Sequence, residues 1–84
     1  MSRYYFDLRQ GDEIVSDEEG LELSTIEAVQ EEAARSLADM ARDAVRKHLD
    51  GTQHQMAVEV RDDSGPVLLV TFTFQADRYS NYTH

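Results

Sequence analysis

Cysteine is absent from the chain, so disulfide bonds, thiolate metal sites and cysteine nucleophiles are excluded. No apolar run is long enough for a signal peptide or a membrane-spanning helix, and charged residues appear within the first few positions. We therefore expect a cytoplasmic location. Because 84 residues have room for one hydrophobic core only, we also expect a single domain.

Positive charge is scarce. Eight Lys and Arg residues stand against 17 Asp and Glu residues, which gives a net charge of −9. A surface this negative repels phosphate groups, so we expect neither a nucleic-acid partner nor attachment to an anionic membrane. A basic protein is the kind of partner that this charge favours. With 40% hydrophobic residues, the chain is still expected to fold.

The strongest pattern is an amphipathic helix from Ser24 to about His48. Its apolar residues recur every three or four positions and form one stripe: Ile26, Val29, Ala33, Leu37, Met40 and Ala44. Ser24 and Glu27 have the spacing of a capping box, and Gly51 follows where the helix would end. A helix of about 25 residues would be roughly 37 Å long, whereas a strand of seven or eight residues spans about 25 Å. We therefore expect part of the helix to extend beyond the sheet, to bend, or to lie against something else.

Two strand-like segments precede this helix and two follow it. They are Arg3–Arg9, Glu13–Ser16, His54–Arg61 and Val67–Gln75. Turn residues at Gln10–Asp12 and Asp62–Gly65 predict two hairpins, and Asp17–Leu23 is predicted to be an extended connector. The pattern predicts an α+β domain of order ββαββ, in which a four-stranded, mainly antiparallel sheet packs one face on the helix. This domain would cover residues 1–75, followed by a tail of residues 76–84 that is flexible or ordered only by a neighbour.

Alternation along the strands separates a helix-facing side from an outer side of the sheet. Besides the helical stripe, the predicted core comprises Tyr4, Phe6, Leu8, Met56, Val58, Val60, Leu68, Val70, Phe72 and Phe74. The outer side is more apolar than an exposed face requires, at Tyr5, Ala57, Val67, Leu69, Thr71 and Thr73. One helix covers one face only, so these residues are a candidate interface for a homo-oligomer, most simply a dimer, through face stacking or edge pairing. The alternative is a tolerated scatter of exposed apolar side chains.

Carboxylates gather around the first predicted hairpin, at Asp12, Glu13, Asp17, Glu18 and Glu19. Their spacing does not match a calcium-binding loop, so a solvated acidic edge is the preferred interpretation, with cation binding left open. The three histidines lack the spacing of zinc ligands, and neither a nucleophile elbow nor a glycine-rich phosphate loop is present. We therefore expect a protein that is not an enzyme, with no catalytic residues, no cofactor and no metal.

Several segments together resemble a known group of proteins. YYFDLR at Tyr4–Arg9, DEEGLEL at Asp17–Leu23 and VRDDSGPVLLVTFTF at Val60–Phe74 resemble short, mainly alphaproteobacterial proteins classed only as a domain of unknown function. This resemblance implies the extent of the domain and assigns no site residues, because the family has no established activity. The aromatic first strand, the hairpin and the capped helix also resemble the antitoxin half of bacterial toxin–antitoxin pairs. The chain departs from that pattern in lacking a DNA-binding extension and in having a second hairpin.

Two functional hypotheses follow from these observations. The leading one is a small, non-catalytic protein-interaction module that self-associates, because the outer sheet face is uncovered and no catalytic arrangement is present. The alternative is an acidic regulator, antitoxin-like or mimicking nucleic acid, that binds a basic protein partner. The two hypotheses differ in the surface they use, since the first needs the apolar outer face and the second needs the carboxylates of the first hairpin.

Overall fold

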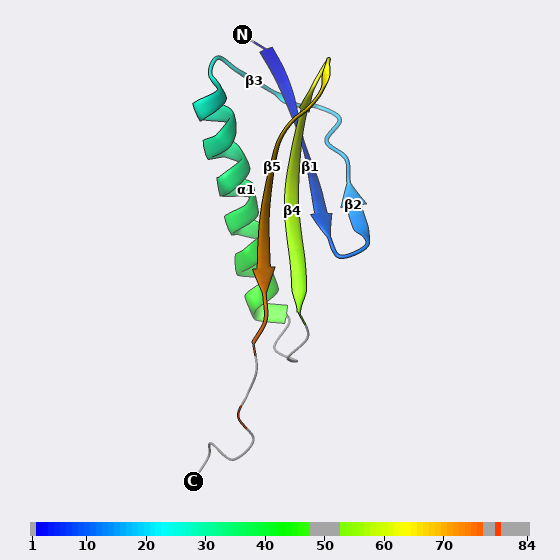
Figure 1. The fold of residues 1–84 in the computed structure, drawn as a ribbon, viewed down its shortest axis with the longest axis vertical. Coiled ribbons are helices and arrows are strands. Elements are labelled where there is room, and N and C mark those ends of the chain that lie inside the picture. Colours follow the sequence, from blue (N-terminus) through cyan, green and yellow to red (C-terminus); the bar gives the residue numbers. More distant parts are fainter. Residues whose placement is uncertain (1, 48–52, 77–78, 80–84) are drawn as a thin grey trace.

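The computed structural model describes residues 2–47, 53–76 and 79. Its elements are β1 (Ser2–Gln10), β2 (Glu13–Val15), β3 (Leu21–Leu23), α1 (Ile26–Lys47), β4 (His54–Asp62) and β5 (Gly65–Phe74). The helix α1 lies on one face of the sheet and runs along β4 and β5 (Figure 1). The predicted α+β class and the packing on one face are confirmed. The predicted count of four strands is wrong, because the antiparallel sheet has five.

The additional strand is β3, which lies in the segment predicted to be a connector. The sheet order is β2-β1-β4-β5, and β3 pairs with the N-terminal part of β1. Both β2 and β3 are antiparallel to β1, with Leu8 opposite Val15 and Tyr4 opposite Leu21. Because β1 has nine residues and β2 only three, the returning chain has enough length to pair with β1 a second time. The strand β5 is left at the opposite edge of the sheet.

The core lies between α1 and the helix-facing side of the sheet. Its buried residues are Phe6, Val29, Ala33, Ala44, Met56, Val58 and Val60, all of which were predicted. Two other predicted core residues are exposed, Ile26 to 47% and Phe72 to 37%. The remaining predicted core residues are partly buried: Tyr4, Leu8, Leu37, Met40, Leu68, Val70 and Phe74. Ile26 is the first residue of α1, and Phe72 is on the edge strand β5, where the sheet ends. The core is therefore centred on β4.

The N-cap of α1 is one residue later than the sequence predicted. Thr25 is the N-cap, because its Oγ1 accepts a hydrogen bond from the N–H of Ala28 at 3.1 Å. A cap at this position places Ala28 where a capping box requires Glu or Gln, so the predicted box of Ser24 and Glu27 does not form. The predicted end at Gly51 lies outside the described residues, as does most of the tail.

The helix does not extend beyond the sheet in the described part of the chain. The 22 residues of α1 correspond to about 33 Å, and the ten residues of β5 correspond to about the same length. The predicted excess is wrong because β4 and β5, with nine and ten residues, are longer than the strands of seven or eight that the sequence predicted.

Candidate functional site

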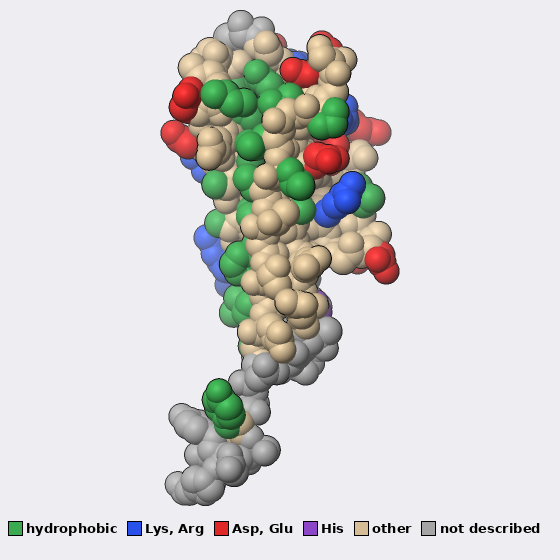
Figure 2. Space-filling view, in the orientation of Figure 1, with side chains coloured by type: hydrophobic (Ala, Val, Ile, Leu, Met, Phe, Trp, Pro, Cys, Tyr) green, Lys and Arg blue, Asp and Glu red, His purple; other side chains and the backbone are tan. Residues whose placement is uncertain are grey.

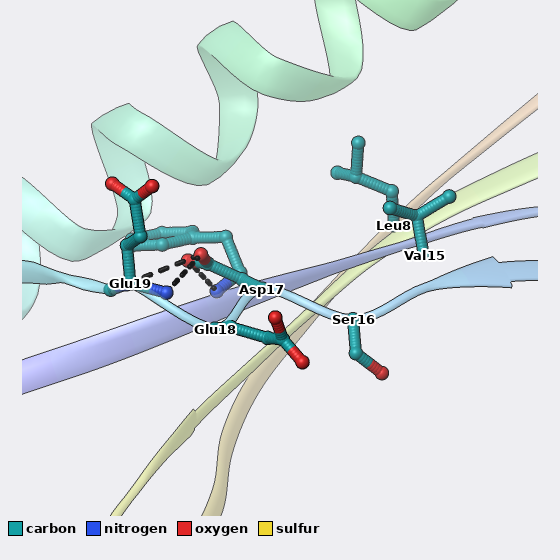
Figure 3. Close-up of a pocket in the computed structure, with 8 residues that line it drawn as sticks. Leu8, Val15, Ser16, Asp17, Glu18 and Glu19 are labelled. Carbon is teal, nitrogen blue, oxygen red and sulfur yellow. Dashed lines mark hydrogen bonds between the residues drawn. The ribbon is translucent and has the colours of Figure 1, made fainter.

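The side-chain carboxylate of Asp17 holds the loop between β2 and β3 against β1. Three residues of β1, 5–7, lie opposite the five residues 16–20, so the returning chain has two residues in excess. The N–H of Phe6 points to this edge and donates to Oδ2 of Asp17 at 3.1 Å. Oδ1 of Asp17 accepts from the N–H groups of Glu19 and Gly20, at 3.1 Å and 3.2 Å (Figure 3). Asp17 thus takes the place of a backbone acceptor for β1 and also organises its own loop.

A polar cluster on the outer face joins this loop to β4. The Nε of Arg61 donates to Oδ2 of Asp7 at 2.9 Å, and its Nη2 donates to the backbone oxygen of Asp17 at 3.0 Å. Oδ1 of Asp7 accepts from the N–H of Asp17 at 2.9 Å, and the guanidinium carbon of Arg61 lies 4.5 Å from the centre of the Tyr5 ring. The hydrogen bond to Asp7 raises the pKa of Arg61 above its usual value. The hydrogen-bonding groups of Asp7, Asp17 and Arg61 pair with one another, so the cluster holds the loop between β2 and β3 onto β1 and β4.

The hydrogen bonds around Asp17 also change its pKa. Partial burial on its own would raise this pKa. The N–H groups of Phe6, Gly20 and Glu19, together with the charge of Arg61, outweigh burial and lower the pKa of Asp17 below its usual value. A carboxyl group of this kind stays ionised near neutral pH and does not act as a general acid there.

The candidate acidic patch is divided between two places. Asp17 is used internally, whereas Asp12, Glu13, Glu18 and Glu19 are exposed. Glu18 and Glu19 line a surface pocket of about 440 Å³ together with the apolar side chains of Leu8 and Val15. Figure 3 shows both glutamate carboxylates directed away from that of Asp17. Asp12 lies instead in the turn between β1 and β2 and Glu13 begins β2, so the structure does not bring all five acids together.

The candidate interface lies on the outer face, as its alternation with the buried residues of β1 and β4 requires. Tyr5 is already covered in part, because its ring faces Arg61 and its Cε2 would lie 2.9 Å from a Cβ added at Gly20. Leu69 is 57% exposed and is the most open apolar side chain of the set. Ala57, Thr71 and Thr73 keep the expected alternation. Ala57 is paired with Arg9 of β1 and with Thr71 of β5, and Thr73 is paired with Gln55 of β4. Val67 has no register partner on β4, since the ladder shifts between Val60 and Arg61.

A second apolar surface, which sequence reasoning missed, lies between α1 and β5. It is a groove of about 440 Å³ lined by Ala34, Leu37, Ala38, Ala41, Arg42, Val45, Val70 and Phe72. Figure 2 shows hydrophobic side chains along this boundary. The signal was present in the sequence, because residues 34, 38, 41 and 45 repeat at helical spacing beside the stripe that packs on the sheet. We call these four residues the helix flank.

The described residues contain no group of three histidine or acidic side chains that could hold a metal ion, and no helix among them is long and apolar enough to cross a membrane. Residues 3–73 match a protein family described as Domain of unknown function (DUF6894). No curated protein and no solved structure matches the chain.

Proposed function

The chain belongs to the DUF6894 family, and we propose for it the function of a small, non-catalytic protein-interaction module that self-associates. One observation carries this proposal: β5 is an edge strand with exposed apolar side chains on both faces. Leu69 on the outer face is 57% exposed and Phe72 on the helix-facing side is 37% exposed. A long, exposed and apolar edge is a surface on which another protein chain pairs readily. The cytoplasmic location expected from the sequence is kept as part of this proposal.

The two edges of the sheet differ in a way that supports the proposal. At the β2–β3 edge, the strands have three residues each and are interrupted by the loop of residues 16–20, which carries exposed carboxylates. Short strands, interruptions and charges are the usual means of preventing edge pairing. At the other edge, β5 has ten residues, and the run from Gly65 to Ala76 contains no charged residue. Its proline lies near the start of the strand, where it leaves most of the edge open.

The molar mass in solution tests this function. We expect size-exclusion chromatography with light scattering to give a mass above the 9.6 kDa of one chain. The association should persist at high salt, because it depends on apolar contacts and because salt screens the repulsion between two chains of charge −9. A mass of one chain at every salt and protein concentration would contradict self-association.

Two matched substitutions locate the surface involved. Leu69→Asp places a charge on β5 and is expected to weaken the association. Val15→Asp places the same charge on the opposite edge, at a side chain that is 61% exposed, and is expected to leave the mass unchanged. Equal effects of the two substitutions would indicate that net charge, and not the β5 surface, controls the association.

The pocket beside Glu18 and Glu19 favours a second candidate function, an acidic regulator that binds a basic protein. Its apolar wall of Leu8 and Val15 would accept the aliphatic part of a lysine or arginine side chain, while the carboxylates would bind the cationic end. Titration with oligo-lysine at low salt tests this candidate. Replacing both glutamates by Gln should weaken binding several-fold, and a binding curve identical to that of the unaltered chain would refute the site. The matched control is Glu31→Gln, an exposed acid on α1 that should matter little.

A further inference from the structure

We propose that β5 pairs with β5 of a second copy of this chain, antiparallel and about a two-fold axis, so that the two sheets become one and the two α1 helices pack against each other. This inference rests on the self-association proposed above and specifies its geometry. The surface has two parts, the free edge of β5 and the helix flank beside it. A partner has to cover both parts.

The free edge presents backbone groups at known positions. In an antiparallel ladder, each residue directs its N–H and C=O to one side, and the side alternates along the strand. Gly11, the residue after β1, donates its N–H to the backbone oxygen of Gln55 in β4 at 3.1 Å, whereas the N–H of Phe6 points to the opposite side, at Asp17. The odd-numbered residues of β1 therefore direct their backbone N–H and C=O groups towards β4. Between Leu68 and Phe74, where the register with β4 is regular, the odd-numbered residues of β5 therefore direct their N–H and C=O groups away from β4. They are Leu69, Thr71 and Thr73.

Charge restricts which surface two copies can share. Each chain has a net charge of −9, so most pairs of surfaces would bring carboxylates together. The edge of β5 avoids this because residues 65–76 carry no charge. The groove beside it is lined by one charged residue only, Arg42, whose Nη1 lies 3.6 Å from Oδ1 of Asp39. The β5 edge and the helix flank are thus a surface on which two copies meet without repulsion between acids.

The position of α1 on the sheet fits a second copy. α1 packs on both β4 and β5, and a helix axis midway between these two strands would be about half a strand spacing inside β5. Pairing β5 with β5 adds one strand spacing of about 4.8 Å between the copies, so the two helix axes would be about 9.6 Å apart. Packed helices lie about 8–10 Å apart. Pairing of the two β5 strands would therefore bring the two helices within packing distance.

The residues of the helix flank suit this contact. Positions 34, 38, 41 and 45 are spaced by four, three and four residues, which is the spacing of a helix–helix seam. Three of them are alanine, and small side chains allow close approach, while Val45 is 46% exposed and would be covered. An unrelated strand on the edge would leave this flank in water. A second copy supplies a strand and a helix together, so it covers both parts of the surface.

Proline substitutions at the two sheet edges test the geometry. Thr71→Pro removes an N–H that faces away from β4, so the fold of one chain is expected to persist, because proline is tolerated at such edge positions. In the dimer the same change removes one backbone donor from each copy. We expect it to raise the dimer dissociation constant by roughly tenfold or more, measured by light scattering over a dilution series. Ile14→Pro is the matched control, because its N–H faces away from β1 at the opposite edge, and it should leave dimerisation unchanged.

A substitution on the helix flank provides independent evidence should the proline variant fail to fold. Ala38→Lys adds a long side chain where the helices would meet, and because it reduces the net negative charge, any weakening cannot come from added repulsion. It should weaken the dimer by at least as much as Thr71→Pro, and Ala38→Ser, which stays small, should not. Dimerisation retained in Ala38→Lys and in folded Thr71→Pro would overturn this interface while leaving self-association intact. A monomeric unaltered chain would overturn both.

Discussion

Removing the Asp17 carboxylate is a direct test of how the interrupted edge of the sheet is held together. Asp17→Ala leaves three N–H groups without their acceptor, of which those of Phe6 and Gly20 are partly buried and that of Glu19 is exposed to water. An unsatisfied buried donor costs about 1–3 kcal/mol, so each of the two partly buried donors is expected to cost about 1 kcal/mol, and the one exposed hydrogen bond contributes about 0.5 kcal/mol or more. We expect a loss of about 2–3 kcal/mol in the free energy of unfolding, a large part of the stability of a small domain.

Urea denaturation followed by circular dichroism at pH 7 measures this loss. Glu18→Ala is the matched control, since it removes an exposed carboxylate from the adjacent position, and it should change the free energy of unfolding by less than about 0.5 kcal/mol. If Asp17→Ala were as mild as this control, the closure of the loop by Asp17 would be refuted.

The pH dependence of the same measurement gives a second check. The pKa of Asp17 is lowered in the folded protein, so the unfolded chain takes up its proton first as the pH falls. The stabilisation is therefore fully present above the pKa of the unfolded chain, about 4, and is lost as the pH falls through the folded pKa. The difference in stability between the unaltered chain and Asp17→Asn should shrink below about pH 4. A difference that stays constant down to pH 2 would contradict the role of the ionised carboxylate.

Two further predictions concern packing, both measured by urea denaturation of dilute protein. Gly20→Ala should destabilise by about 2–3 kcal/mol, because Gly20 has φ +73° and an added Cβ would lie 2.9 Å from two β1 side chains. Gly11→Ala, at φ +61° with open space around it, should cost only about 1 kcal/mol, and equal losses would argue against the close approach. Phe72→Ala should lose about 1–2 kcal/mol, below the 3–5 kcal/mol typical of a buried phenylalanine, because Phe72 is 37% exposed. Val58→Ala, at a fully buried position, should lose about 2–3 kcal/mol, and a larger loss at Phe72 would place Phe72 in the core.

The local periodicity of the sequence was sufficient to predict the main elements. The helical stripe predicted the buried Val29, Ala33 and Ala44, and strand alternation predicted the buried Val58 and Val60. These signals come from residues close together in the chain, and burial on one face follows from the helical and strand periods. Both predicted hairpins are present for the same reason, since turn residues lie between alternating segments.

Features that depend on which strands are neighbours could not be predicted. The contact of Arg61 with Asp7 joins residues 54 positions apart and requires β1 to lie beside β4, which no local pattern indicates. The pairing of β3 rests on three residues, fewer than alternation can distinguish from a connector. The helix flank was missed because its alanines were interpreted only as part of an amphipathic helix. The helix flank can be recognised as an open surface only once β5 is known to be the edge strand.

The amide of Thr71 provides the most direct test of the proposed pairing of β5 with a second copy. In a single chain this N–H faces solvent at the sheet edge and should exchange with deuterium rapidly, as should that of Ile14 at the opposite edge. We predict that hydrogen exchange followed by NMR will find the Thr71 amide protected at high protein concentration, with protection that declines on dilution, and the Ile14 amide unprotected throughout. Rapid exchange of the Thr71 amide under conditions where light scattering gives a dimer would contradict the account.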